Sequence, residues 1–211
     1  MASCRIHTAP VPKAPTSRQA RWAPLSGPHA HRRTAGLVAR ALPQLAERLG
    51  PALSADDRAT LERSAAALAD FYAARPDRFA PIHGDYRLDN LLFGPGDEVF
   101  AVDWQSLSLG LPARDLAYLI STGLSVADRR AVEADVVGAY WDELTRYGVA
   151  GYSRAECFDD YRLGLLHCPQ IIVLGAAYGI RTERGDAMFA AMIERSCQAI
   201  RDLDTLAVLH H

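Results

Sequence analysis

The strand-like segments of this chain gather in one short region, and their position limits the folds open to it. Three apolar runs follow one another there: APIHG (80–84), NLLFG (90–94) and EVFAVDW (98–104). The turn residues GPGD (94–97) join the second run to the third, which predicts an antiparallel hairpin. Helical patterns flank this region, so the order is not the strand–helix alternation that builds a parallel sheet. We predict a mainly helical α+β fold with one small β-hairpin.

The helices are predicted from apolar periodicity and from capping residues. Ser54 with Asp57, and Ser153 with Glu156, have the spacing of capping boxes. Pro169 lies inside a long helical pattern and predicts a kink there. Helices are expected over residues 37–50, 54–75, 113–124, 125–148, 153–180 and 183–209.

The beginning of the chain differs from the rest. Residues 1–35 contain five prolines and no apolar periodicity, which predicts a disordered or spurious leader. A secretory signal would need an apolar core, and an organelle transit peptide would need an amphipathic helix that the prolines interrupt. Residues 36–211 are expected to form one folded domain.

The charge distribution argues against some classes of partner. Residues 1–46 hold 7 of the 23 basic residues and no acidic one, so the remainder carries 16 basic against 25 acidic residues, a net charge of −9. An acidic body argues against a nucleic-acid groove. The longest apolar stretch, residues 171–180, is too short to span a bilayer. Four scattered cysteines suit a reducing compartment. We therefore expect a cytoplasmic protein that binds neither nucleic acid nor membrane.

The predicted hairpin carries residues suited to phosphate chemistry. Asn90 and Asp103 lie at the outer ends of two runs joined by a tight turn, so their side chains should lie close together. Amide and carboxylate oxygens suit Mg²⁺, which also keeps positions for water and substrate phosphates. Asp85, in the preceding loop, could accept a proton from a hydroxyl, and Arg87 could put positive charge beside a transferring phosphoryl group. A base, two metal ligands and a cation are the parts that a phosphotransferase needs.

These residues also form a pattern known from a family of enzymes. HGDYRLDN (83–90) followed by VDW (102–104) resembles the catalytic loop and metal-binding aspartate of the aminoglycoside phosphotransferase, choline kinase and ecdysteroid kinase-like families, which are relatives of protein kinases. About one chain in a thousand of this length would contain H-G-D-x₄-N by chance. Further matching segments are GLPARDLAYLI (110–120), YRLGLLHC (161–168) and RDLD (201–204). The resemblance covers roughly residues 37–208.

The resemblance implies a role for each matching residue. Asp85 resembles the catalytic base, and Asn90 and Asp103 resemble the Mg²⁺ ligands that hold the nucleotide. Arg87 falls where many protein kinases place a lysine that contacts the γ-phosphate. The implied activity is ATP-dependent transfer of a γ-phosphate to a small-molecule alcohol, with Mg²⁺ and ATP as cofactors.

Two further residues resemble supports of the catalytic loop. Asp115 resembles the buried aspartate that anchors the loop through backbone hydrogen bonds. His83 is expected to pack and to hydrogen-bond within the loop rather than to move protons.

The sequence shows neither the Gly-rich loop nor the strand lysine of the superfamily. No G-x-G-x-x-G precedes residue 81, and the single lysine, Lys13, lies in VPKAP, where prolines preclude a central strand. The expectation is therefore a kinase-like C-terminal lobe without its N-terminal lobe, from a truncated protein. Apolar surface exposed where that lobe would lie could drive self-association.

Other interpretations stay open. The chain could be a non-catalytic, pseudokinase-like binding module, or a fragment that works only with a separate N-terminal lobe. A metal-dependent hydrolase that uses His83, Asp85 and Asp103 is a weaker alternative, because hydrolases usually gather more His ligands. The Asp and Asn residues of the hairpin could also be turn formers alone. Asp89, Asp159 and Asp160 are expected to be solvated surface charges. Trp104 and Gln105 could line the pocket, and Trp104 could equally belong to the core.

Overall fold

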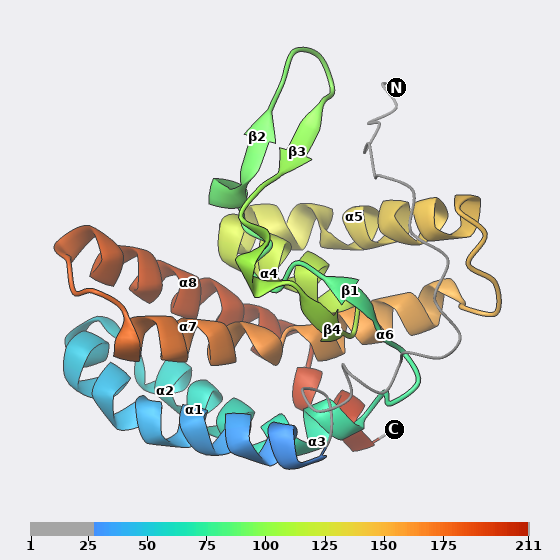
Figure 1. Cartoon of the computed structure of the whole chain (residues 1–211). Coiled ribbons are helices and arrows are strands. Elements are labelled where there is room, and N and C mark those ends of the chain that lie inside the picture. Colours follow the sequence, from blue (N-terminus) through green and yellow to red (C-terminus); the bar gives the residue numbers. More distant parts are fainter. Residues whose placement is uncertain (1–27, 211) are drawn as a thin grey trace.

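In the computed structural model of this chain, residues 28–210 are described, and they form a helical body with two small antiparallel sheets (Figure 1). The expected α+β class, mainly helical with small antiparallel strands, is confirmed for this part of the chain. The helices are α1 (Pro28–Leu49), α2 (Ala55–Ala66), α3 (Leu68–Ala73), α4 (Ala113–Gly123), α5 (Val126–Arg146), α6 (Arg154–Gly164), α7 (His167–Tyr178) and α8 (Glu183–Asp202). The strands are β1 (Ala80–Ile82), β2 (Leu91–Phe93), β3 (Val99–Ala101) and β4 (Ser108–Gly110), and short 3₁₀ turns are η3 (Gly50–Ala52), η4 (Leu88–Asn90), η5 (Trp104–Ser106) and η6 (Thr205–His210).

The predicted capping residues begin their helices. The hydroxyl of Ser54 accepts the backbone N–H of Asp57 at 3.0 Å, at the start of α2. Ser153 and Glu156 form a full capping box at α6, with the Glu156 carboxylate accepting the Ser153 backbone N–H at 2.8 Å. Such caps satisfy N–H groups that a helix start otherwise leaves unpaired.

Helix α1 begins earlier than the sequence predicted. Its first residue is Pro28, a residue type favoured at the first helical position because it has no N–H to satisfy. Residues 28–35 of the expected leader are thus helical, and Ala35 packs against the hydrophobic core. The rest of the expected leader, residues 1–27, lies outside the described residues.

The long helical pattern of residues 153–180 divides into two helices. The helix is interrupted at Leu165 and Leu166, whose N–H groups donate to carbonyl oxygens three residues back rather than four. Pro169 therefore falls in the first turn of α7, where its missing N–H costs little, and the expected kink becomes a helix boundary. The last helix ends at Asp202, because Asp204 takes a left-handed backbone conformation with φ of 44°.

Each sheet consists of two antiparallel strands. The expected hairpin is β2–β3, with Leu91 opposite Ala101 and Phe93 opposite Val99. Strand β1 pairs with β4, a strand that the sequence did not predict. The β2–β3 hairpin stands out from the helical body, whereas β1 and β4 lie against it (Figure 1).

The hydrophobic core lies between the helices. Helix α7 packs against α1, α4 and α8, and α4 packs against both α6 and α8. Leu166, Ile172 and Ile193 are fully buried in this core. Gly164 allows close packing of α6 on α4, since a Cβ there would lie 3.0 Å from the Ala113 carbonyl oxygen. Helix α4 thus holds a fixed position directly behind the loop that precedes β2. In the described part of the chain, no helix is long and apolar enough to cross a membrane.

Candidate active site

Asp115 anchors the loop that follows β1. From the first turn of α4, its two carboxylate oxygens accept the backbone N–H groups of His83 at 2.6 Å and of Gly84 at 3.0 Å. Burial raises the pKa of the Asp115 carboxyl, and the two N–H bonds partly offset that effect. The bidentate contact fixes the backbone immediately before Asp85.

His83 uses both ring nitrogens inside the site. Its Nδ1 accepts the N–H of Asp85 at 3.3 Å, so Nε2 carries the proton donated to the Val102 carbonyl oxygen at 2.8 Å. The ring also packs against Trp104, with ring centroids 4.7 Å apart. The His83 side chain is buried and ties the loop to the strand that returns from the hairpin, an arrangement that leaves no lone pair for a metal.

Asn90 lies directly against Asp85. Its Nδ2 donates to the Asp85 carbonyl oxygen at 2.8 Å and to the Asp85 carboxylate at 3.2 Å. The Val102 N–H in turn donates to the Asn90 carbonyl oxygen at 2.9 Å, so the backbone of Asn90 lies beside the residue that precedes Asp103. The hairpin therefore brings these segments together as the sequence predicted. With its amide nitrogen directed at Asp85, Asn90 presents its amide oxygen as the atom that can bind a cation.

Asp103 has an unusual backbone conformation. Its φ and ψ are 64° and 57°, the left-handed region that a residue other than glycine rarely enters. Such strain collects at functional sites and is maintained by the surrounding structure. The residue is exposed, and Gln105 Nε2 lies 3.5 Å from its carboxylate. The turn thus holds a carboxylate outward at the base of the hairpin.

Arg87 is engaged within its own loop. Its Nε donates to the Asp89 carboxylate at 2.9 Å, and its Nη2 bonds the same carboxylate and lies 3.2 Å from Met188 Sδ on α8. The Asp89 side chain is mostly exposed, so solvent screens the pair. To contact a phosphate, the Arg87 guanidinium would have to divide its hydrogen bonds between Asp89 and the phosphate, or break those to Asp89.

Tyr118 is a site residue that the sequence reasoning missed. It lies on α4 one turn after Asp115 and is 2% exposed, with its hydroxyl near the Asp85 carboxylate. Burial, followed by the negative charge of Asp85, raises the pKa of the Tyr118 hydroxyl, which therefore stays protonated and acts as a donor. The signal was in DLAY (115–118), whose i, i+3 spacing puts both side chains on the face toward the loop.

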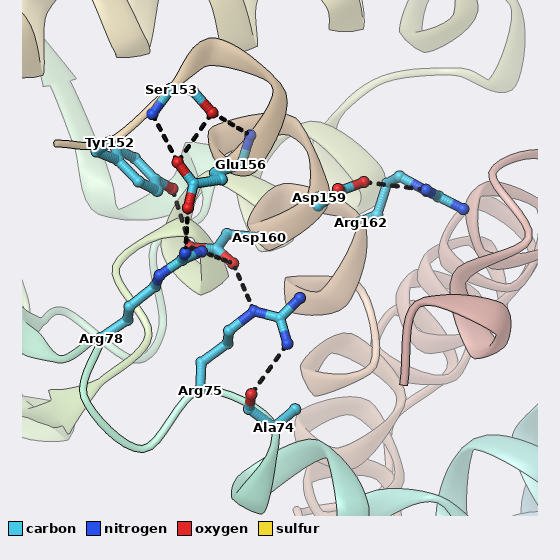
Figure 2. Close-up of polar contacts among 9 residues, drawn as sticks. All are labelled: Ala74, Arg75, Arg78, Tyr152, Ser153, Glu156, Asp159, Asp160 and Arg162. Atoms are coloured by element: carbon cyan, nitrogen blue, oxygen red, sulfur yellow. Dashed lines mark hydrogen bonds and ion pairs between the residues drawn. The ribbon is translucent and has the colours of Figure 1, made fainter. Parts of the chain in front are cut away.

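One expectation about charged residues is wrong. Asp160 is not a solvated charge but is 1% exposed, because Arg75, Arg78 and Tyr152 all hydrogen-bond its carboxylate (Figure 2). Asp159, next to it, pairs with Arg162, and its side chain is 48% exposed, which agrees with the expected position on the outer face of the helix. Trp104 is exposed as well, which places it on the surface of the site rather than in the core.

The residues present suit one divalent cation shared with a substrate. Among the described residues, no three His, Cys, Asp or Glu side chains gather as a metal site. One carboxylate from Asp103 and one amide oxygen from Asn90 are instead an oxygen set that fits Mg²⁺, which keeps waters and takes its remaining ligands from phosphates. An anchored loop with Asp85, hydrogen-bonded to Asn90 at the base of a hairpin that also carries Asp103, has residue types that a phosphotransferase site uses.

Comparison with known proteins agrees with this class. A model of the phosphotransferase enzyme family matches residues 2–155, and the chain therefore belongs to that family. A shorter similarity links it to acyl-CoA dehydrogenase family member 10 of Mus musculus, with 52% identity over 46 residues. Those residues are 21% of this chain and only 4% of the mouse protein. No solved structure was found to match.

Proposed function

We propose that this chain is an ATP- and Mg²⁺-dependent phosphotransferase that moves a γ-phosphate to the hydroxyl of a small-molecule alcohol. The observation that carries the proposal is the contact of Asn90 with Asp85 at a hairpin base whose return strand leads into Asp103. Membership of the phosphotransferase enzyme family supports the reaction class.

In the proposed mechanism, Asp85 is the group that accepts the proton of the attacking hydroxyl. The Asn90 amide donates to Asp85 and orients its carboxylate, and the protonated Tyr118 hydroxyl lies near that carboxylate. A positioned general base of this kind contributes about 10²–10⁴-fold to a rate. Asp115 contributes indirectly, since it fixes the backbone from which Asp85 projects.

Asn90 and Asp103 would hold Mg²⁺, and Arg87 would contact the transferring phosphoryl group. When bound, Mg²⁺ neutralises phosphate charge and orients the phosphates for in-line attack. The apolar side chains Leu92 and Phe100 of the hairpin are 55% and 48% exposed, and they offer a surface for the nucleotide base. A cytosolic location suits this proposal, because Cys157, Cys168 and Cys197 are free, buried thiols.

The test is an ADP-coupled assay of the purified chain over a panel of small alcohols. The variant Asp85→Asn should lose about 10²–10⁴-fold in rate while its unfolding temperature stays unchanged. Asp135→Asn, an exposed change on α5, is the matched control and should keep full activity. Equal rates for wild type and Asp85→Asn would exclude Asp85 as the base.

A second candidate is a binding module that takes up Mg²⁺–ATP without turnover. The observation that favours it is the engagement of Arg87 by Asp89, which withdraws the one loop cation from the phosphate position. Nucleotide binding without ADP formation on any alcohol would support this candidate. ADP formation that depends on Asp85 would exclude it.

A further inference from the structure

A second hollow lies beside the catalytic loop and is separate from the site described above. It has a volume of about 730 Å³ and lies between α3, the β4 segment and α7. Gly84 forms part of its wall, but Asp85, Asn90 and Asp103 do not line it. Helix α4 contributes to both the candidate active site and this cavity. Asp115 holds the catalytic loop, and the preceding residue, Arg114, lines the cavity.

The charge of this cavity is one-sided. Arg32, Arg75, Arg78 and Arg114 line it, and none of the described lining residues is an aspartate or glutamate. Residues 47–211 as a whole are acidic, so this concentration of arginine is local. A surface lined by one sign of charge attracts ligands of the opposite sign.

Two of these arginines are already neutralised and make the wall rigid. Figure 2 shows Arg75 and Arg78 reaching from the segment after α3 to Asp160 on α6, at 3.2 and 3.0 Å. Arg78 also pairs with Glu156 at 2.6 Å. These pairs fix the segment between α3 and β1, but they leave little net charge for a ligand.

Arg114 is different, because its charge is buried without a counter-charge in contact. Its side chain is 8% exposed, and in the described part of the chain no carboxylate lies within ion-pair distance. Its Nη2 lies 2.5 and 2.9 Å from the ring nitrogens of His167, and its Nε is buried with no hydrogen-bond partner among the described residues. Burial and the neighbouring guanidinium lower the pKa of His167, so the ring is neutral and supplies no negative charge.

The packing around Arg114 holds the guanidinium in place. The rings of Phe71 and Tyr72 lie with their centroids 5.8 Å from Cζ. Gly110 closes another side, since a Cβ there would lie 2.7 Å from Nη1. A buried cation that lacks a counter-ion is costly for a fold to keep, and a bound anion would remove that cost.

The remaining wall is partly apolar and open to solvent, and it also includes the polar residues Ser106, Ser108 and Gln170. Phe79 and Leu107 line the cavity although 60% and 54% of their surfaces are exposed. A ligand that matched the whole cavity would therefore carry an apolar body as well as a charge. We propose that this cavity binds a small organic oxyanion, a carboxylate or phosphate group on an apolar body, whose charge is taken by Arg114.

The proposal is tested by isothermal titration calorimetry of the purified chain at constant ionic strength. The probes are phenyl phosphate and benzoate, which distinguish the two oxyanions, and benzyl alcohol is the uncharged control. At least one anionic probe should bind saturably and benzyl alcohol should not. No saturable binding of either anion, or equal binding of benzyl alcohol, would overturn the proposal.

Two variants locate the binding. Arg114→Gln should lower the affinity for the anionic probe by about tenfold or more, whereas Arg63→Gln, an exposed change on α2, should leave that affinity unchanged. Because Arg114→Gln could disturb folding, a second variant leaves the buried residues intact. Ala69→Glu puts a negative charge at an exposed position on the rim in the first turn of α3, where a helix tolerates acid, and should weaken the anion similarly.

The matched control for the rim variant is Ala66→Glu, which adds the same charge on α2 away from the cavity. Equal affinity in Ala69→Glu and Ala66→Glu would contradict the site. Competition of the probe with Mg²⁺–ATP would contradict it too, since it would place the anion in the nucleotide site. The titration needs no turnover, so its result is independent of phosphotransfer activity.

Discussion

Asp85 lies at the centre of a set of short-range contacts that determine where its carboxylate points. Asp115 holds the two peptide groups before it, and the His83 ring accepts its N–H. Asn90 donates to its side chain, and the Tyr118 hydroxyl lies near that side chain. Preorganised groups of this kind need no rearrangement during a reaction, which is the main way in which active sites lower a barrier. All of these neighbours of Asp85 except Tyr118 were identified from the sequence as residues of the site.

The glycine before Asp85 is required by geometry. Gly84 has a φ of +83°, and a Cβ there would lie 2.6 Å from the Ser106 carbonyl oxygen. We expect Gly84→Ala to lower the free energy of unfolding by about 1–2 kcal/mol for the left-handed backbone, with about 1–3 kcal/mol more for the steric overlap.

The matched control is Gly96→Ala, in the hairpin turn, with a φ of +72° and no atom within 4 Å of its added Cβ. Gly96→Ala should lose only the stability that the left-handed backbone costs. Urea unfolding of both variants measures the difference between their free energies of unfolding. An equal loss of unfolding free energy in both variants would show that Ser106 moves aside without cost, so that its close approach to Gly84 would not require a glycine.

At the scale of helices, α5 and α8 are joined by a buried ion-pair network. The side chain of Arg129 on α5 is 1% exposed and bonds Glu133 at 2.6 Å, and it also bonds Asp202 at the end of α8. The neighbouring Arg130 bonds the same Asp202 at 2.7 Å but is 53% exposed. Removing one member of a buried pair leaves an uncompensated charge, whereas an exposed pair is screened.

We expect Arg129→Met to lower the free energy of unfolding by about 3–5 kcal/mol and Arg130→Met by less than about 1 kcal/mol. Arg130→Met loses two exposed hydrogen bonds to Asp202, whereas Arg129→Met loses one part-buried bond to Asp202 and one buried bond to Glu133. A larger loss from Arg129→Met therefore reports the cost of a buried, unpaired charge. Chemical denaturation monitored by circular dichroism measures both. A loss in Arg129→Met no larger than that in Arg130→Met would mean that water reaches the network.

The helices and the hairpin could be predicted because their signals are local. Ser153 with Glu156 begins a helix through contacts within four residues, and GPGD (94–97) closes a hairpin within one turn. Strand β4 could not be predicted, since it exists only as a partner for β1, from which it is 26 residues away in sequence. The burial of Asp160 was equally hidden, because the arginines that neutralise it come from 82 and 85 residues earlier in the chain.

The site shows the same division between local and distant information. The backbone pairing of Asn90 with Val102 follows from the tight turn of the hairpin, so the sequence was sufficient to predict that these segments lie side by side. The pairing of Arg87 with Asp89, and its approach to Met188 on α8, depend on how the loop meets a distant helix. Side-chain choices of that kind need the assembled fold.

At the scale of the whole molecule, the β2–β3 hairpin exposes an apolar surface. Phe93 is 70% exposed on one face of the hairpin and Phe100 is 48% exposed on the other, on strands that stand out from the helical body (Figure 1). Exposed apolar patches commonly mark contact surfaces. We propose that this surface is covered by self-association when no other partner occupies it.

Sedimentation velocity over a range of concentrations should therefore show reversible association of the chain. The double variant Phe93→Ser/Phe100→Ser should remain monomeric at concentrations where the wild type associates. Tyr178→Ser/Ile180→Ser removes exposed apolar side chains between α7 and α8, and it should associate as the wild type does. A monomeric wild type, or loss of association in both double variants, would contradict a role for the hairpin.

The central claim is that Asn90 and Asp103 bind a divalent cation together with ATP, and a thermal shift tests it most directly. A ligand at about 100 times its Kd stabilises a protein by about 2.7 kcal/mol, or about 5–10 °C for a domain of this size. Asp103→Asn keeps the shape of the side chain and tolerates the left-handed backbone, so the variant should unfold at the wild-type temperature without nucleotide. We predict a Mg²⁺-dependent ATP shift in the wild type and none in Asp103→Asn. A wild type without that shift, or a variant that keeps it, would contradict the account.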